Sequence, residues 1–168
     1  MKIEDVPKDC IRTHSGLFLN VFEPTVEMIC VEDIAHALSQ QPRFAGHLGR
    51  FYSVAQHSYH CCELASEKNK LPTLMHDGSE FALLDMPTPI KARMPEYKKI
   101  ESHLMEIIAK AFGFQYPYDP EIKKIDTYML HLEWDNLVVD KNPNFVCFTP
   151  EEAEKKFLEM YYEITKKK

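Results

Sequence analysis

Four side chains in this sequence have the chemistry to bind a metal ion together: His57, the adjacent pair His76 and Asp77, and Asp126. Two imidazoles and two carboxylates make a mixed nitrogen and oxygen ligand set, whereas structural zinc sites prefer thiolates. A divalent ion bound by such a set lowers the pKa of coordinated water and supplies hydroxide near neutral pH. The residue types therefore favour a hydrolytic centre with one divalent transition metal, Mn²⁺, Co²⁺, Ni²⁺, Fe²⁺ or Zn²⁺.

A further carboxylate, Glu80, stands three residues after Asp77 and four after His76. On a continuous helix Glu80 returns to the same face as this pair, where it can exchange a proton with water beside a metal. His57 also has an ordinary explanation, because an inward-facing histidine is more often hydrogen-bonded in the core than bound to a metal. Cys61, one helical turn after His57, is an alternative zinc ligand.

Asp126 lies on the apolar stripe formed by Ile122 and Met129, where an unpaired carboxylate is costly. Its charge therefore needs a partner, which is either a metal ion or a salt bridge with Lys123 or Arg43. A single ion shared with the histidines explains the separate polar residues most simply.

The hydrophobic spacing and the capping residues predict an all-α bundle with a small N-terminal β-hairpin. The hairpin is expected over residues 11–23, with its turn near Ser15 and Gly16. Helices are expected over 31–39, from about 54 to 65, from Pro72 to Leu84, over 95–112, and onward from Pro120 and from Pro150. Proline in the first turn and capping boxes at Ser53 and Thr149 mark several of these starts. The candidate ligands thus come from three different helices.

Composition limits the class of protein. The length of 168 residues suits a single domain over residues 1–168, with 45% hydrophobic and 27% charged residues, as in ordinary globular proteins. The net charge of −6 argues against duplex nucleic acid as a partner. No apolar run spans a bilayer, and the polar start Met1–Asp5 argues against a secretory signal. Five cysteines without a C-x-x-C pair indicate reduced thiols, so a cytoplasmic protein without a membrane partner is expected.

The order H…HD…D of the candidate ligands resembles the HD-domain metal-dependent phosphohydrolases. Four segments resemble the family's first-histidine helix, its HD helix, the stretch after it and its last-aspartate helix: Phe51–Ser58, Leu74–Glu80, Asp85–Lys91 and Ile122–Leu130. The resemblance covers roughly residues 11–140. It implies an HD-domain helical bundle in which His57, His76, Asp77 and Asp126 bind the metal.

The resemblance also implies roles for residues around the metal. Glu80 would shuttle a proton beside the attacking water, and Asp85 would hold a sugar hydroxyl or assist the leaving group. Positive charges on Arg43, Lys91 and Lys123 would hold phosphate oxygens. The alternative interpretation makes the two lysines solvated surface residues.

Phe44 would contact the sugar or the base of a nucleotide, at a position where the related monophosphate enzymes tend to have tryptophan. The resemblance is strongest to two nucleotide-acting branches of the family. One branch, the bacterial 5′-deoxynucleotidases, removes phosphate from deoxynucleoside monophosphates. The other, the small phage-type deoxyadenosine triphosphate triphosphohydrolases, releases triphosphate and a nucleoside. The short chain and the segments Asp33–Leu38 and Pro42–His47 favour the phage type.

We therefore expect an enzyme in which water attacks the α-phosphorus of a dATP-like deoxynucleoside triphosphate. A 5′-deoxynucleotidase is the alternative, and a non-catalytic nucleotide-binding module is the alternative of another class. A second Mg²⁺ on the substrate phosphates stays open. A di-iron oxygenase is disfavoured because His103 is the sole histidine between Asp77 and Asp126. Phe157, Leu158, Tyr161 and Tyr162 of the last helix leave open both a homo-oligomer and a core-facing stripe.

Overall fold

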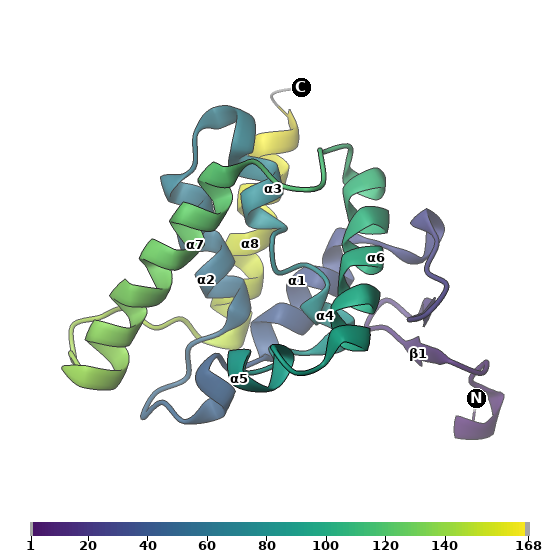
Figure 1. The fold of residues 1–168 in the computed structure, drawn as a ribbon, viewed down its shortest axis with the longest axis horizontal. Helices are drawn as coiled ribbons and strands as arrows, with labels where there is room; N and C mark the ends of the chain where they lie inside the picture. Colours follow the sequence, from purple (N-terminus) through teal and green to yellow (C-terminus); the bar gives the residue numbers. More distant parts are fainter. Residues whose placement is uncertain (1, 167–168) are drawn as a thin grey trace.

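The computed structural model describes residues 2–166 and shows a mostly helical protein with a small hairpin (Figure 1). The strands are β1 (Cys10–Arg12) and β2 (Phe18–Asn20). Within residues 2–166 there are eight α-helices: α1 (Val31–Gln40), α2 (Val54–Leu64), α3 (Lys70–Leu74), α4 (Glu80–Leu83), α5 (Thr88–Lys91), α6 (Pro95–Phe112), α7 (Pro120–Glu133) and α8 (Pro150–Lys166). The expected all-α bundle with an N-terminal hairpin is therefore confirmed.

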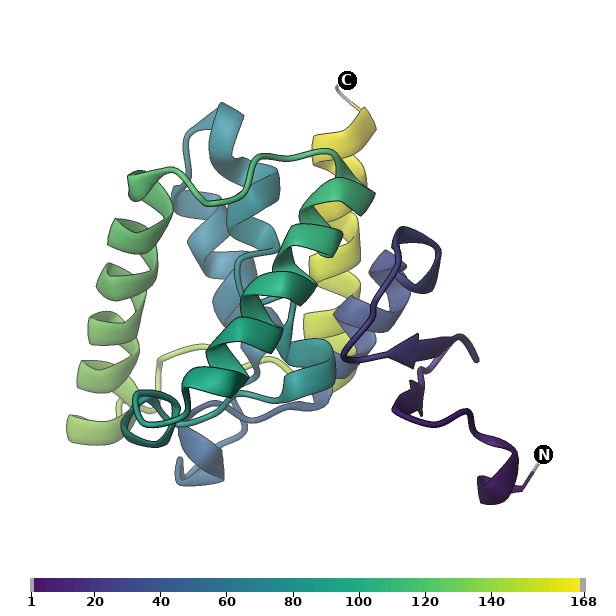
Figure 2. The same ribbon diagram turned by 45° about the vertical axis from the view of Figure 1, so that its right-hand side comes forward.

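The N-terminal hairpin lies at one side of the helical bundle, at the right in Figure 2. Its strands are antiparallel, with Ile11 paired with Leu19. Gly16 has φ +94° in the connecting turn, a backbone conformation that glycine adopts without strain. Leu19 of β2 is fully buried, so β2 is fixed to the helical core.

Helix α8 holds the bundle together. It packs against α1, α2 and α3, while α2 packs against α7 (Figures 1 and 2). Ala153 and Phe157 of α8 are fully buried. The apolar stripe of this helix therefore faces the core, and Tyr162 at its edge donates a hydrogen bond to Glu32.

Capping residues begin and end the helices that carry the site. The Ser53 hydroxyl accepts a hydrogen bond from the Gln56 backbone at 3.1 Å and begins α2. Thr149 and Glu152 form a reciprocal capping box at the start of α8. Gly113, with φ +71°, ends α6 in the left-handed conformation. These boundaries agree with the predicted ones within one or two residues.

The helix predicted from Pro72 to Leu84 is wrong, because the chain breaks into α3 and α4 with turns between them. Backbone hydrogen bonds there join residues three apart, including Gly78 N to Met75 O at 2.8 Å and Glu80 N to Asp77 O at 3.0 Å. A Cβ atom on Gly78 would lie 2.9 Å from Met75 O. His76 and Asp77 therefore lie on a tight turn that depends on glycine.

Several short elements were not expected from the sequence, among them α5 and a π-helical turn. Helix α5 begins directly after Pro87 and has Pro89 in its first turn, and the π-helical turn over Trp134–Val139 extends α7. Among residues 2–166, no helix has the length and apolar character needed to cross a membrane.

Candidate metal centre

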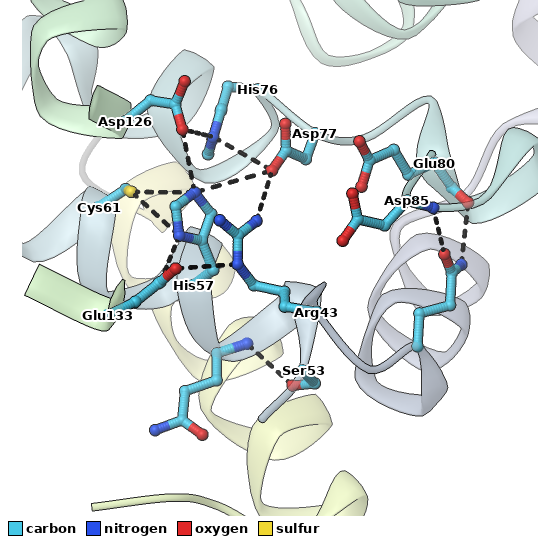
Figure 3. Close-up of polar contacts among 12 residues, drawn as sticks. Arg43, Ser53, His57, Cys61, His76, Asp77, Glu80, Asp85, Asp126 and Glu133 are labelled. Atoms are coloured by element: carbon cyan, nitrogen blue, oxygen red, sulfur yellow. Dashed lines mark hydrogen bonds and ion pairs between the residues drawn. The ribbon is translucent and has the colours of Figure 1, made fainter. Parts of the chain in front are cut away.

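His57 is fully buried on α2 and is oriented by Glu133 of α7 (Figure 3). Its Nδ1 lies 2.6 Å from Glu133 Oε1. Because an ionised carboxylate only accepts hydrogen bonds, Nδ1 carries the proton. The other nitrogen, Nε2, lies 3.4 Å from Asp126 Oδ1 and 3.8 Å from Asp77 Oδ2. Nε2 of His57 therefore faces both aspartates.

His76 is oriented in the same way by the turn that carries it. Its Nδ1 donates to the Thr73 carbonyl at 2.7 Å, which leaves Nε2 without a proton in the neutral ring. Nε2 lies 3.3 Å from Asp77 Oδ2 and 3.9 Å from Asp126 Oδ1. It is buried and makes no hydrogen bond to any described residue. The structure thus brings together all four residues that were predicted to bind a metal.

A buried group of His57, Cys61 and His76 could hold a metal ion. Their donor atoms lie within 4.8 Å of one another, and Cys61 Sγ is 3.5 Å from His57 Nε2. Imidazole and thiolate ligands suit several first-row divalent ions, and the unprotonated Nε2 of His76 is a buried lone pair without a hydrogen-bond partner among the described residues. The residues present therefore fit a metal. Burial raises the pKa of the Cys61 thiol.

Asp126 has a charged partner besides the histidines. Lys123 Nζ lies 2.7 Å from Asp126 Oδ2, while 81% of the lysine side chain is exposed. Burial alone would raise the pKa of Asp126, but the imidazoles of His57 and His76 together with Lys123 outweigh it and hold the pKa far below its usual value. Asp126 is therefore an ionised carboxylate beside two imidazoles.

Glu133 is a fully buried carboxylate that sequence analysis missed. Besides His57, it accepts hydrogen bonds from Arg43 Nε at 3.0 Å (Figure 3) and from the Tyr52 hydroxyl at 2.9 Å. Burial opposes its ionisation, but the charges of His57 and Arg43 prevail and lower its pKa. Glu133 follows Asp126 by two helical turns and shares its helix face. That spacing was the signal that could have identified it.

Glu80 and Asp85 face the same region from α4 and the segment after it (Figure 3). Burial, reinforced by the charges of Asp77 and Asp85, raises the pKa of Glu80 well above its usual value. Glu80 Oε1 lies 4.0 Å from Lys91 Nζ, and Oε2 has no hydrogen-bond partner among residues 2–166. Burial likewise raises the pKa of Asp85.

Gln41 and Glu101 support this region, and neither was predicted from the sequence. The Gln41 amide donates to the Glu80 carbonyl at 2.9 Å and accepts from the Asp85 backbone at 3.1 Å. Glu101 of α6 pairs with Lys91. The spacing between Glu80 and Asp85 is therefore held by a side chain from the end of α1.

Two cavities meet at the candidate ligands. The larger, about 1610 Å³, is lined by every predicted site residue except the two histidines: Arg43, Phe44, Asp77, Glu80, Asp85, Lys91, Lys123 and Asp126. The smaller, about 260 Å³, is lined by His76 together with Tyr116 and Tyr118. Asp77, Asp126 and both lysines line both cavities. The two aspartates are therefore accessible from both cavities.

Comparison with known proteins finds similarity to proteins without an assigned activity. No family model matches the chain. The uncharacterized protein YfdR of Escherichia coli (strain K12) is 36% identical over 130 residues, which cover 77% of this chain and 73% of YfdR. The uncharacterized protein RCAP_rcc00048 of Rhodobacter capsulatus is 34% identical over 140 residues, which cover 75% of this chain and 71% of that protein.

Proposed function

The chain belongs to the family of YfdR-like proteins, and we propose that this member is a metal-dependent phosphohydrolase of the HD type that acts on deoxynucleotides. The observation that carries the proposal is the convergence of two imidazole nitrogens and two carboxylate oxygens at the meeting point of two cavities. Cationic side chains line the same cavities, as a phosphorylated substrate requires.

The proposed metal ligands are His57, His76, Asp77 and Asp126. Around this ring of donors, neighbouring nitrogen and oxygen atoms lie between 3.3 and 3.9 Å apart. Ligands placed at 2.0–2.2 Å from one ion would lie about 3.0–3.5 Å from each other. Two of the four spacings already fall in that range, and the two longer ones, 3.8 and 3.9 Å, would shorten by a few tenths of an ångström around a shared ion. Both Nδ1 atoms are held by other acceptors, as is usual for metal-binding histidines. Such an ion, when bound, would acidify water at the site and draw charge from phosphoryl oxygens.

The two aspartates fit this role better than Cys61 does. Asp77 and Asp126 line both cavities. The Cys61 thiol, in contrast, is fully buried beside His57 and lines neither of these two cavities. An ion held by the aspartates would therefore be reachable by substrate, as a catalytic site requires.

Glu80 and Asp85 are the proposed proton-transfer and leaving-group residues. A buried carboxyl with a raised pKa, such as Glu80, can take a proton from water and return it near neutral pH. The water oxygen would bond to the α-phosphorus while the bond from that phosphorus to O5′ breaks. Asp85, in the same cavity, would position the sugar and its leaving O5′, which receives the proton.

Three cations are proposed to hold the phosphate oxygens. The Arg43 guanidinium is held by Glu133 and lies 3.8 Å from Asp77 Oδ2. Lys91 and Lys123 line both cavities. Their positive charges would offset the negative charge that develops on the phosphoryl oxygens during attack.

Product analysis tests the proposal. Metal-loaded protein is incubated with deoxynucleoside mono-, di- and triphosphates, and the products are separated by chromatography. Triphosphate and a nucleoside from a dATP-like substrate are the expected products. Orthophosphate from monophosphates alone would make the protein a 5′-deoxynucleotidase. Binding without turnover of any nucleotide, with Co²⁺, Mn²⁺ and Mg²⁺ each tried, would overturn catalysis and leave a nucleotide-binding module.

A further inference from the structure

We propose that Trp134, together with Phe44, forms the subsite that binds the planar heteroaromatic base of the nucleotide. The inference rests on the proposed function, because it assigns the part of the large cavity that would receive the base. Both rings line that cavity, and their centroids are 6.3 Å apart with planes inclined by 46°. Rings this close contact each other, so the base would stack on the exposed face of Trp134, with Phe44 supporting that ring from behind; such stacking is largely independent of base identity.

Trp134 is unusual among the large aromatic side chains of the chain. It is the only tryptophan in the sequence, and 49% of it is exposed. The π-helical turn begins at this residue, and such turns interrupt α-helices frequently at functional sites. Glu133, directly before it, points to His57 and Arg43, while Trp134 lines the cavity. One helix end therefore supports the metal centre and presents an aromatic face beside it.

The Phe44 side of the pair is held in an uncommon conformation. Phe44 and Ala45 have φ +55° and +52°, in the left-handed region that bulky residues rarely occupy. The backbone N–H of Arg43 donates a hydrogen bond to the Tyr52 carbonyl at 2.9 Å. Pro42 and Ser53 pair in an isolated antiparallel β-bridge. This closed loop keeps the Phe44 ring opposite Trp134, and the Arg43 guanidinium lies 5.7 Å from the centre of the same ring.

The spacing along α7 suits a nucleotide. Trp134 follows Asp126 by eight residues, or about 12 Å along the helix axis. A phosphate near Asp126 and a base near Trp134 would leave room for the pentose between them. Arg43 and Lys123 line the same cavity and supply charge for the phosphate, whereas the aromatic pair supplies stacking for an uncharged ring.

Because the chain has one tryptophan, its fluorescence reports on this position alone. Metal-loaded protein is titrated with deoxyadenosine, which has no phosphate to hydrolyse, with excitation at the red edge of the tryptophan band. Saturable quenching is expected. A parallel titration with 2-deoxyribose 5-phosphate, which lacks a base, is expected to leave the emission unchanged.

Kinetics of two Trp134 variants and one control variant complete the test. Trp134→Ala is expected to raise KM for deoxynucleotides about 10-fold or more with little change in kcat, while the inhibition constant of 2-deoxyribose 5-phosphate as a competitor stays the same. Trp134→Phe keeps an aromatic face and should restore most of the affinity. Tyr128→Ala is the matched control, because Tyr128 is a 58% exposed aromatic residue of the same helix that lines neither cavity described above.

The outcomes separate this inference from the proposed function. Nucleotide turnover with unchanged tryptophan emission and an unchanged KM in Trp134→Ala would overturn the base subsite alone. Saturable quenching by deoxyadenosine without turnover of any nucleotide would support the subsite and overturn catalysis. Neither quenching nor turnover would overturn both.

Discussion

Glu133 accepts hydrogen bonds from His57, Tyr52 and Arg43 although it is fully buried. One carboxylate thus fixes the ring of a proposed metal ligand and the guanidinium of a proposed phosphate-binding residue. Removing the side chain would leave the buried Arg43 charge with only the more distant Asp77 carboxylate at 3.8 Å, and breaking a buried ion pair typically costs about 3–5 kcal/mol of stability. The sharper test is therefore a change that keeps the size of the side chain.

Glu133→Gln keeps an oxygen for His57 but loses the charge that holds Arg43. We expect metal affinity to fall about 10- to 100-fold, as for other partners of metal-binding histidines. Equilibrium dialysis against buffered metal ion measures this affinity in the folded protein. Glu151→Gln, at an exposed position of α8, is the matched control. Equal affinities for wild type and Glu133→Gln would contradict the positioning role.

Variants of Asp77 and Cys61 distinguish the two candidate ligand sets, one with the aspartates and one with the cysteine. If the aspartates are ligands, Asp77→Ala should abolish metal content and turnover together, whereas Cys61→Ser should retain both. Metal content by mass spectrometry and nucleotide turnover are measured on the same preparations. Loss of metal from Cys61→Ser with retention in Asp77→Ala would assign the ion to the buried cysteine and histidines instead.

Glu80→Gln tests proton transfer separately from metal binding. The variant keeps the shape of the side chain and is expected to bind metal normally. Its kcat should fall by a factor of about 10² or more, because the carboxyl that exchanges protons is lost. An unchanged kcat with a full complement of metal would remove Glu80 from the mechanism.

At the scale of elements, the turn between α3 and α4 decides where the HD pair lies. Apolar spacing in residues 72–84 predicted one helix, but hydrogen bonds between residues three apart divide it. Gly78 makes this possible, because any β-carbon there would lie 2.9 Å from the Met75 carbonyl. Helix propensity and turn geometry therefore predict opposite effects of alanine at this position.

Gly78→Ala would stabilise a continuous helix by up to about 1 kcal/mol. In the observed turn it should instead destabilise the protein by about 1–3 kcal/mol, because the methyl group meets a backbone oxygen. Urea unfolding midpoints measure the difference. Gly49→Ala is the matched control, since no atom lies within 4 Å of the β-carbon position at Gly49. A stabilised Gly78→Ala variant would contradict this account of the turn.

The elements that sequence analysis predicted correctly have strong local signals. The Ser53 cap, the Thr149 capping box and the left-handed Gly113 act within a few residues of themselves. The pairing of His57 with Glu133, in contrast, is a contact between α2 and α7. Such contacts join residues far apart in the sequence, so local spacing does not reveal them.

At the scale of the whole molecule, the predicted ligands come from three places: from α2, from the turn that precedes α4, and from α7. The helical bundle brings them together. Their order along the chain suggested this convergence, whereas the supporting residues Glu133, Gln41 and Glu101 emerged only from the fold. The cytoplasmic location stays a prediction, and the question of a homo-oligomer stays open, because the arrangement of the ligands bears on neither.

The most direct test of the central claim is turnover as a function of bound metal in the wild-type protein. Protein stripped with a chelator is titrated with Co²⁺ or Mn²⁺, and nucleoside release from deoxynucleotides is measured at each step. We predict no turnover without metal and a rise that saturates at one tightly bound ion per chain. Full turnover by the stripped protein, or none at any metal content, would contradict a metal-dependent phosphohydrolase.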